Sequence, residues 1–121
     1  MQDCLFCKIA AKQIPASIVY EDDELVAFKD INPAAPVHLL LIPKVHVSSL
    51  SDCTGSHAEL LGKLMALAPK LAHEHGIAVQ YDADGTPSGG FKSVINSGPN
   101  GGQEVYQLHL HVYGGPRPWR I

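Results

Sequence analysis

One long amphipathic helix is all that this sequence offers to cover the face of a sheet, which limits the folds open to the chain. The helix is predicted to begin at Ser56, whose hydroxyl forms a capping box with Glu59, and to end at Gly76. Its apolar residues share one face, so it should lie across a sheet. They are Leu60, Leu61, Leu64, Leu67, Ala68, Leu71 and Ala72.

Short runs of β-forming residues lie on both sides of this helix. They cover residues 17–22, 24–30, 37–43, 90–97 and 104–114. The only other helical segment is a short one that ends at Ile14-Pro15, and a parallel sheet needs more helical crossovers than that. We therefore expect an α+β fold: a five-stranded antiparallel sheet with one long helix and a short N-terminal helix.

Length and composition predict one domain over residues 1–121, because a chain with 45% hydrophobic residues can bury one modest core. No apolar run approaches the roughly 20 residues of a membrane span, and the N-terminus lacks a secretion signal. We therefore expect a cytoplasmic protein without a membrane partner. The net charge of −3, with no cluster of lysine or arginine, argues against nucleic-acid binding.

The last predicted strand carries the most distinctive side chains. At the two-residue period of a strand, Gln107, His109 and His111 share one face, and the alternate residues are apolar. Histidine can act there as nucleophile, proton carrier or metal ligand, although a His-x-His pair also occurs on an ordinary polar face. The glycine-rich loop before the strand, residues 98–103, is expected to offer free N–H groups to a phosphate.

Two segments carry a resemblance to a known family. Residues 101–115, GGQEVYQLHLHVYGG, resemble the signature of the histidine triad (HIT) superfamily. Residues 19–46, VYEDDELVAFKDINPAAPVHLLLIPKVH, resemble its upstream half, especially in the Hint branch of purine nucleoside phosphoramidases. The resemblance runs over nearly the whole chain. It implies the HIT fold, which agrees with the expected elements, and a homodimer that pairs two such sheets.

The resemblance also implies roles for individual residues. His109 would attack the phosphorus of an AMP- or GMP-type phosphoramidate and form a covalent nucleotidyl-histidine intermediate for water to hydrolyse. His111 would contact phosphate oxygens, His38 would join the same network, and Asp30 would hold the ribose hydroxyls. The other nucleotide-binding positions are Phe6, Ile14, Phe28, Ile31 and Leu40 around the purine, and Asn96, Gly102, Gln103 and Val105 beside the phosphate. Taken singly, the apolar residues are explained as well by core packing, and Asp30 by turn formation.

Two residues depart from the family pattern. Gln107 stands where the first histidine of the triad is expected, and an amide carries neither charge nor a mobile proton. Glu104 stands where some relatives have serine. Three functions therefore stay open: a phosphoramidase, a nucleotide-binding sensor with weakened catalysis, and a dinucleoside polyphosphate hydrolase as in the Fhit branch.

A metal site is a further alternative. Cys4 and Cys7 at helical spacing, with His46, match three ligands of the structural zinc site that bacterial relatives are expected to form. The fourth ligand would have to be Gln107, and an amide oxygen is a poor partner for Zn²⁺. The two cysteines could equally be small packing residues. We expect no cofactor to be required for the reaction and leave structural zinc open.

Overall fold

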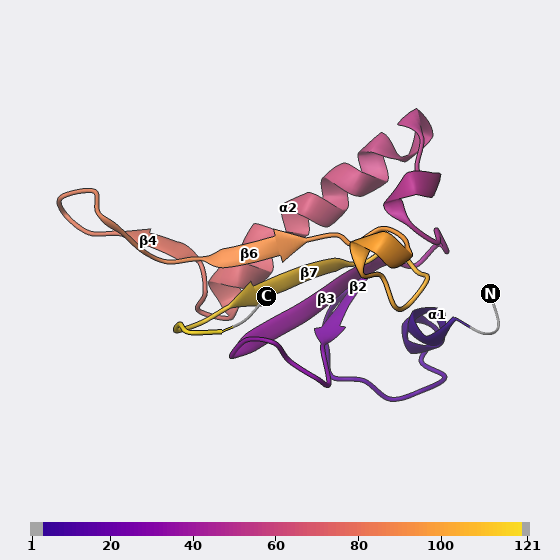
Figure 1. The fold of residues 1–121 in the computed structure, drawn as a ribbon, viewed down its shortest axis with the longest axis horizontal. Coiled ribbons are helices and arrows are strands. Elements are labelled where there is room, and N and C mark those ends of the chain that lie inside the picture. Colours follow the sequence, from indigo (N-terminus) through magenta and orange to yellow (C-terminus); the bar gives the residue numbers. More distant parts are fainter. Residues whose placement is uncertain (1–3, 120–121) are drawn as a thin grey trace.

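The computed structural model describes residues 4–119 and has the expected α+β architecture (Figure 1). Five antiparallel strands form one sheet in the order β1-β2-β3-β7-β6. Their bounds are Ile18–Glu21 for β1, Leu25–Lys29 for β2, Val37–Pro43 for β3, Phe91–Val94 for β6 and Leu110–Gly114 for β7. The predicted five-stranded antiparallel sheet is therefore confirmed.

The long helix α2, Ala58–Glu74, packs against β3 and β7 on one face of the sheet (Figure 1). Its fully buried residues include Leu64 and Leu71, which belong to one core cluster with Leu41 and Leu110 of the strands. The predicted apolar stripe is confirmed, and the helix continues through Pro69.

The start of α2 differs from the prediction. A 3₁₀ turn, η2 at Gly55–His57, precedes the helix, and Thr54 caps it. The Thr54 hydroxyl accepts a hydrogen bond from the Ser56 N–H, and His57 Nδ1 accepts one from the Thr54 N–H at 2.9 Å. The predicted Ser56–Glu59 capping box is wrong because Thr54 and His57 already form one.

The short helix α1, Leu5–Ala10, lies on the opposite face of the sheet (Figure 1). Phe6 and Ile9 pack there in a second core cluster with residues of β2 and β3 that include Phe28 and Leu40. A helix of six residues covers only part of this face. The remainder stays open for a ligand, which explains why the cavity with the histidines lies on this side.

A small hairpin lies outside the main sheet. Its strands are β4, Val79–Tyr81, and β5, Pro87–Gly89, and the hairpin extends away from the rest of the fold (Figure 1). None of the strands expected from the sequence lies between Gly76 and residue 90, where a loop was expected, and this expectation is wrong. The missed signal is Asp84-Gly85 after the β-type run Val79–Tyr81, with Gly85 at a φ of 82°.

The last strand is shorter than predicted. We expected residues 104–114, but β7 begins only at Leu110. Before that point the chain bonds to the segment after β3 instead of to β6: the Leu108 N–H donates to the Val47 carbonyl at 2.6 Å. Two further 3₁₀ turns, η1 at Leu50–Asp52 and η3 at Pro99–Gly101, complete the fold. Between residues 4 and 119, no helix has the length and apolarity needed to cross a membrane.

Candidate functional site

A cavity of about 470 Å³ opens on the side of the sheet that carries α1. This volume lies within the range of roughly 300–1,000 Å³ that is usual for small-molecule sites. The predicted site residues that line it are Phe6, Ile14, Phe28, Asp30, Ile31, Leu40, Asn96, Gly102, Val105, His109 and His111. The fold thus brings together residues from five separate parts of the chain. His38 and Gln103 are buried and do not line the cavity.

The apolar wall of the cavity is built from aromatic contacts. The Phe6 ring meets Phe28 edge-on, with centroids 5.3 Å apart, and meets His109 in the same way at 5.0 Å. Phe6, Phe28 and Leu40 are also core residues, so packing accounts for their positions. Packing does not account for Ile31, which is 89% exposed at the rim of the cavity. An exposed apolar side chain at that place offers a surface on which a flat base can lie.

One hydrogen bond fixes the tautomer of His109. Its Nδ1 lies 2.6 Å from the Gln107 carbonyl oxygen. A carbonyl can only accept, so Nδ1 carries the proton and Nε2 of the neutral ring keeps its lone pair. The ring lines the cavity, so the Nε2 lone pair is available as a nucleophile toward a bound substrate.

A second chain of hydrogen bonds fixes His38 and His111. The Ala34 N–H donates to His38 Nδ1 at 3.1 Å, so His38 carries its proton on Nε2. His38 Nε2 then donates to His111 Nδ1 at 3.0 Å, which leaves the proton of neutral His111 on Nε2. His111 lines the cavity and therefore offers an N–H donor to an anionic group there.

Burial keeps these three histidines neutral. It lowers the pKa of His111 from 6.5 to about 4, with smaller contributions from His109 and His38. Burial also lowers the pKa of His109, against the opposing effects of the Gln107 carbonyl and Asp30. The pKa of His38 is lowered by burial as well, although the Asp30 carboxylate opposes this change. At neutral pH the network therefore holds the tautomers that its hydrogen bonds require.

The lowered pKa of His111 predicts a pH dependence of stability. Between pH 6.5 and about 4 the unfolded chain binds a proton on this residue that the folded chain does not. The free energy of unfolding therefore falls as the pH is lowered through this window, and His38 and His109 contribute in the same direction. Urea unfolding at a series of pH values measures the slope.

His111→Asn is the control for this measurement, because it removes one titrating group and should make the slope shallower. Glu21 and Asp22 also have lowered pKa values and so contribute to the free energy of unfolding. This contribution is lost mainly below their ordinary pKa values of 4.5 and 3.8, outside the pH range compared here. An equal slope for wild type and variant between pH 5 and 6.5 would contradict the prediction.

Asp30 has contacts in two directions. Its Oδ1 accepts the Asn32 N–H at 2.8 Å, the turn contact that the sequence analysis considered as an alternative. Its Oδ2 lies 3.4 Å from His38 Nε2. Because Asp30 also lines the cavity, turn formation and a role toward a ligand are compatible.

The glycine-rich loop differs from the expectation of free N–H groups. The N–H groups of Gly101, Gly102 and Gln103 donate to the carbonyls of Gly98 and Pro99 within the loop. The Gln103 side chain holds the loop from inside: its Oε1 accepts the Gly98 N–H, and its Nε2 donates to the Ser48 and Val105 carbonyls. Gln103 therefore shapes the loop with its side chain, and these three N–H groups are not free for a phosphate.

Gln107 was predicted to share a face with His109 and His111, but it does not line the cavity. Its side chain is fully buried and makes three hydrogen bonds to the segment after β3. Oε1 accepts the Val47 N–H at 2.9 Å, and Nε2 donates to the Pro43 and Val45 carbonyls at 2.8 and 2.9 Å. Gln107 thus links the segment that carries His109 to residues 43–47.

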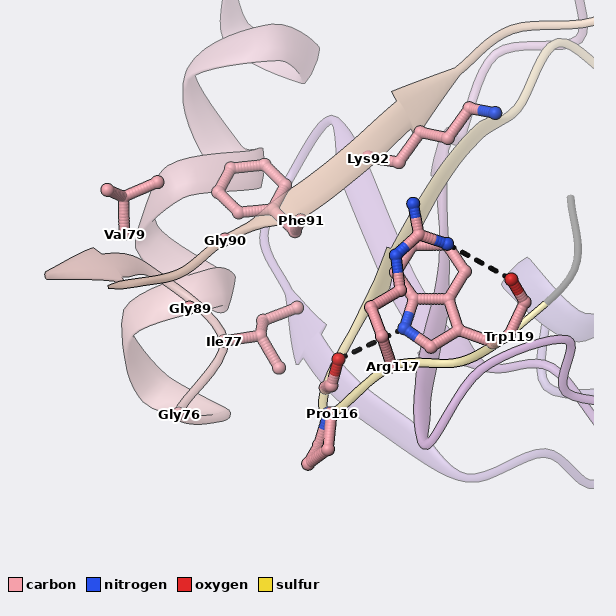
Figure 2. Close-up of a pocket in the computed structure, with 11 residues that line it drawn as sticks. Gly76, Ile77, Val79, Gly89, Gly90, Phe91, Lys92, Pro116, Arg117 and Trp119 are labelled. Atoms are coloured by element: carbon pink, nitrogen blue, oxygen red, sulfur yellow. Dashed lines mark hydrogen bonds between the residues drawn. The ribbon is translucent and has the colours of Figure 1, made fainter. Parts of the chain in front are cut away.

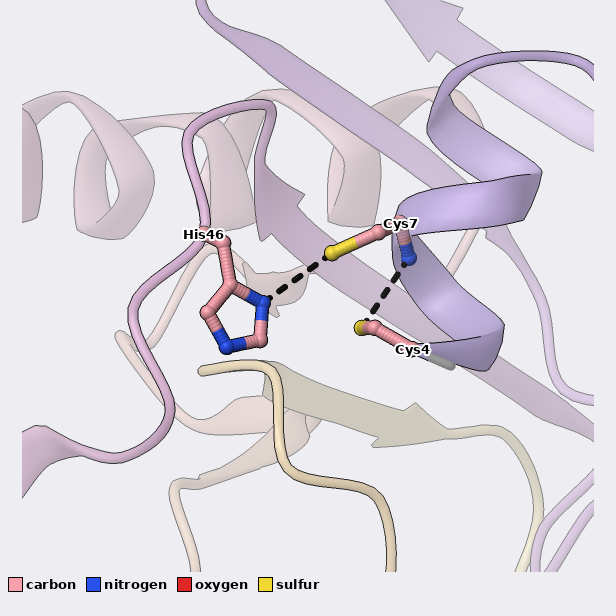
Figure 3. A group of neighbouring side chains, drawn as sticks. All are labelled: Cys4, Cys7 and His46. Atoms are coloured by element: carbon pink, nitrogen blue, oxygen red, sulfur yellow. Dashed lines mark hydrogen bonds between the residues drawn. The ribbon is translucent and has the colours of Figure 1, made fainter. Parts of the chain in front are cut away.

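Cys4, Cys7 and His46 form the predicted cluster, with their ligand atoms within 4.8 Å of one another (Figure 3). Cys7 Sγ lies 3.1 Å from His46 Nδ1. Two thiols and one imidazole are a donor set that suits Zn²⁺. Burial raises the pKa of Cys7 to about 11, so the metal-free thiol is protonated. Gln107, proposed as a fourth ligand, already uses its amide elsewhere.

Residues that line the cavity but were not predicted from the sequence include Pro15, Ala16 and Lys29. Lys29, the last residue of β2, adds a positive charge next to Asp30, and Pro15 and Ala16 extend the wall beyond Ile14. Lys29 could have been found from its place directly before Asp30 in the segment that carries the resemblance. Pro15 and Ala16 give no such signal.

A larger cavity, about 630 Å³, lies away from the histidines between the root of the β4–β5 hairpin and the C-terminal segment (Figure 2). The Arg117 guanidinium lies over the Trp119 ring, 4.1 Å from its centroid. Trp119 Nε1 donates to the Gly115 carbonyl at 3.0 Å. Among the described residues that line this cavity, the charged ones are Lys92 and Arg117, and none is a histidine, cysteine or carboxylate.

Comparison with known proteins gives a family match over almost the whole chain. Residues 3–118 match the family model described as the C-terminal binding region of the scavenger mRNA decapping enzyme. Protein HitA of Neisseria gonorrhoeae is 54% identical over 116 residues, which are 96% of this chain and 99% of that protein. Purine nucleoside phosphoramidase of Escherichia coli K12 is 38% identical over 114 residues, 94% of this chain and 88% of that one.

A solved structure agrees with the sequence matches. A HIT family hydrolase from Legionella pneumophila superposes with a TM-score of 0.84 and is 43% identical, with 95% of each chain covered. The similarity therefore extends over almost the whole fold.

Proposed function

Because the chain belongs to the histidine triad superfamily and is a hydrolase of that family, we propose that it cleaves the P–N bond of purine nucleoside 5′-phosphoramidates. The E. coli relative named purine nucleoside phosphoramidase supports this substrate class. The cavity supports it chemically, since one end is apolar and the other carries a nucleophilic imidazole and a donor imidazole. The substrate would be an AMP- or GMP-type nucleotide whose phosphate is joined to an amine.

The reaction would take place in two steps. In the first, the Nε2 lone pair of His109 attacks the α-phosphorus, the P–N bond breaks, and the amine leaves with a proton taken from solvent. The Nδ1 proton of His109 stays on the ring, and its bond to the Gln107 carbonyl stabilises the positive charge that develops. In the second step, water attacks the nucleotidyl-imidazole, which releases the nucleoside monophosphate and neutral His109.

His111 and His38 would stabilise the phosphate during both steps. The Nε2 proton of His111 is directed to a phosphate oxygen, while His38 holds His111 in this tautomer. No step requires a mobile proton at position 107. A glutamine there is therefore compatible with covalent catalysis.

A single observation carries the proposal: the 2.6 Å hydrogen bond from His109 Nδ1 to the Gln107 carbonyl, which leaves Nε2 free in the cavity. The direct test is a comparison of substrates in chelated buffer. An adenosine 5′-phosphoramidate should be hydrolysed with a rapid first turnover, followed by slower steady turnover. Much faster cleavage of a diadenosine polyphosphate would favour the Fhit-like alternative. Tight AMP binding without turnover of either substrate would favour the sensor.

Asp30→Asn tests the proposed contact with the ribose hydroxyls. The neutral amide accepts a weaker hydrogen bond than the carboxylate, so KM should rise by about tenfold while kcat changes less. The 2′-deoxy substrate is the control, since its KM should rise less in the variant. Equal losses for both substrates would mean that Asp30 acts through its contacts with Asn32 and His38 and not through the ribose.

The homodimer that the family resemblance implies stays a prediction. Strand β6 is the last strand of the sheet and pairs only with β7 among residues 4–119. This leaves its outer edge available to the sheet of a second copy. Sedimentation velocity at micromolar concentration would measure the assembly state.

A further inference from the structure

One aromatic ring packs against two histidines of the network without lining the cavity. Tyr113 of β7 is paired with His38 of β3 across the sheet and lies on the same face of its strand as His111. Its ring centroid is 4.2 Å from that of His38 and 5.3 Å from that of His111. Tyr113 is buried and does not line the cavity, so it can influence a bound substrate only through these histidines.

The rings of Tyr113 and His111 are almost parallel, with an interplanar angle of 4°. The side-chain torsion that rotates an imidazole is broad, so its own preference does not fix the ring. The hydrogen bond from His38 Nε2 to His111 Nδ1 holds one nitrogen, but the direction of the other N–H of His111 still changes when the ring tilts about that nitrogen. A parallel ring at stacking distance opposes this tilt, because offset-stacked aromatic rings attract each other.

The C-terminal segment holds the Tyr113 ring in turn. The Trp119 ring stacks against Tyr113, with centroids 6.3 Å apart and an interplanar angle of 21°. Trp119 is itself anchored, because its Nε1 donates to the Gly115 carbonyl and the Arg117 guanidinium lies over its ring (Figure 2). A series of stacked rings therefore connects the C-terminal segment to the histidine that offers an N–H donor to the cavity.

The hydroxyl of Tyr113 takes no part in these contacts. Among residues 4–119, no side chain or backbone group forms a hydrogen bond with it. Every fully buried side-chain nitrogen or oxygen in the described part of the chain has a partner, so this hydroxyl reaches solvent. The ring alone makes the contacts with the two histidines.

We propose that Tyr113 is a positioning residue whose ring holds His38 and His111 in the orientation that directs His111 Nε2–H into the cavity. This role rests on the proposed phosphoramidate hydrolysis, in which that N–H donates to a phosphate oxygen. Negative charge on the oxygen grows toward the transition state, so a well-aligned donor stabilises the transition state more than the bound substrate. Loss of the ring is therefore expected to lower kcat more than it raises KM.

Substitutions at position 113 separate the flat ring from the hydroxyl and from apolar burial. Tyr113→Phe keeps the ring, so kcat for an adenosine 5′-phosphoramidate should stay within about twofold of wild type. Tyr113→Leu keeps an apolar side chain without a flat ring, and kcat should fall by at least about tenfold while KM changes by less than about threefold. Tyr81→Leu is the matched control, because Tyr81 is 71% exposed on β4, and both constants should stay at their wild-type values.

Exchange of a histidine ring proton tests the held orientation without reference to activity. In ¹⁵N-labelled protein, the Nε2 proton of His38 should be protected from exchange with water by its bond to His111 Nδ1. Tyr113→Phe should retain this protection. In Tyr113→Leu the two imidazoles tilt more freely, and exchange should become at least about tenfold faster. Backbone amides of β3 and β7 are the control for general loosening of the fold, and their exchange should stay as in wild type.

A kcat of Tyr113→Leu within about twofold of wild type would overturn the proposal, and so would unchanged exchange of the His38 proton. Equal losses of kcat in Tyr113→Phe and Tyr113→Leu would assign the effect to the hydroxyl and contradict the proposal too. If the wild-type protein cleaves no phosphoramidate, the proposed function fails, and the exchange comparison alone decides whether Tyr113 orients the histidines. If Tyr113→Leu does not fold, Tyr113→Met, whose flexible side chain fills irregular gaps, takes its place.

Discussion

His109→Ala is expected to lower turnover of an adenosine 5′-phosphoramidate by at least about 10⁴-fold, the loss typical of removing an essential nucleophile. The physical reason is that no other imidazole of the network can replace it. His38 Nε2 and His111 Nδ1 are hydrogen-bonded to one another. His38 Nδ1 accepts the Ala34 N–H, and the remaining nitrogen, His111 Nε2, carries a proton and has no lone pair for attack. The measurement is rapid-quench kinetics, in which the first turnover of wild type should leave nucleotide covalently attached to the protein.

The controls separate chemistry from folding. His109→Ala should keep its AMP affinity within a few-fold, because Phe28, Leu40 and Asp30 still line the cavity. His111→Asn should lose less activity than His109→Ala and still accumulate the covalent species, since it loses a donor and keeps the nucleophile. Residual turnover of His109→Ala near the wild-type rate would disprove the covalent route.

The sequence predicted the fold well where one physical rule acted alone. The apolar stripe of α2 was found as expected, and Leu110 and Val112 lie in its core while His109 and His111 line the cavity. The alternation did not extend to Gln107, which is buried away from the cavity. The predictions failed where several local signals competed. Thr54 displaced Ser56 as the cap, and Asp84-Gly85 formed a hairpin where only a loop was expected. Such choices depend on small differences between neighbouring turns.

The site was predicted as a set of residues but not as a set of interactions. The sequence spacing predicted that His109 and His111 share one face. The position of the proton on each ring depends on the hydrogen bonds with the Gln107 carbonyl and with His38, which the spacing does not show. The hydrogen bonds within the glycine-rich loop could not be predicted, because the sequence does not show whether a backbone N–H group is free or already donates to a carbonyl. The partners of Gln107 lie about 60 residues away in the chain.

Gln107→Leu is expected to lower the free energy of unfolding by about 3 kcal/mol, because it leaves buried backbone groups without hydrogen bonds. The Val47 N–H and the Pro43 carbonyl lose their partner in a place that water does not reach, and the Val45 carbonyl is partly buried. Leucine has a similar volume, so little of the loss comes from a cavity. Urea denaturation in chelated buffer measures the change without any contribution from metal.

Two further variants determine whether the hydrogen bonds are the cause. Gln80→Leu, at an exposed position of β4, should change the free energy of unfolding by less than about 0.5 kcal/mol. Gln107→Glu keeps the shape but turns a carboxylate toward the Pro43 and Val45 carbonyls, so it should destabilise the fold despite its near-identical volume. If Gln107→Glu were as stable as wild type, shape alone would explain the residue. If it is destabilised like Gln107→Leu, the two amide hydrogens hold the 43–47 segment, and with it His46, against the segment before β7 whose Gln107 carbonyl orients His109.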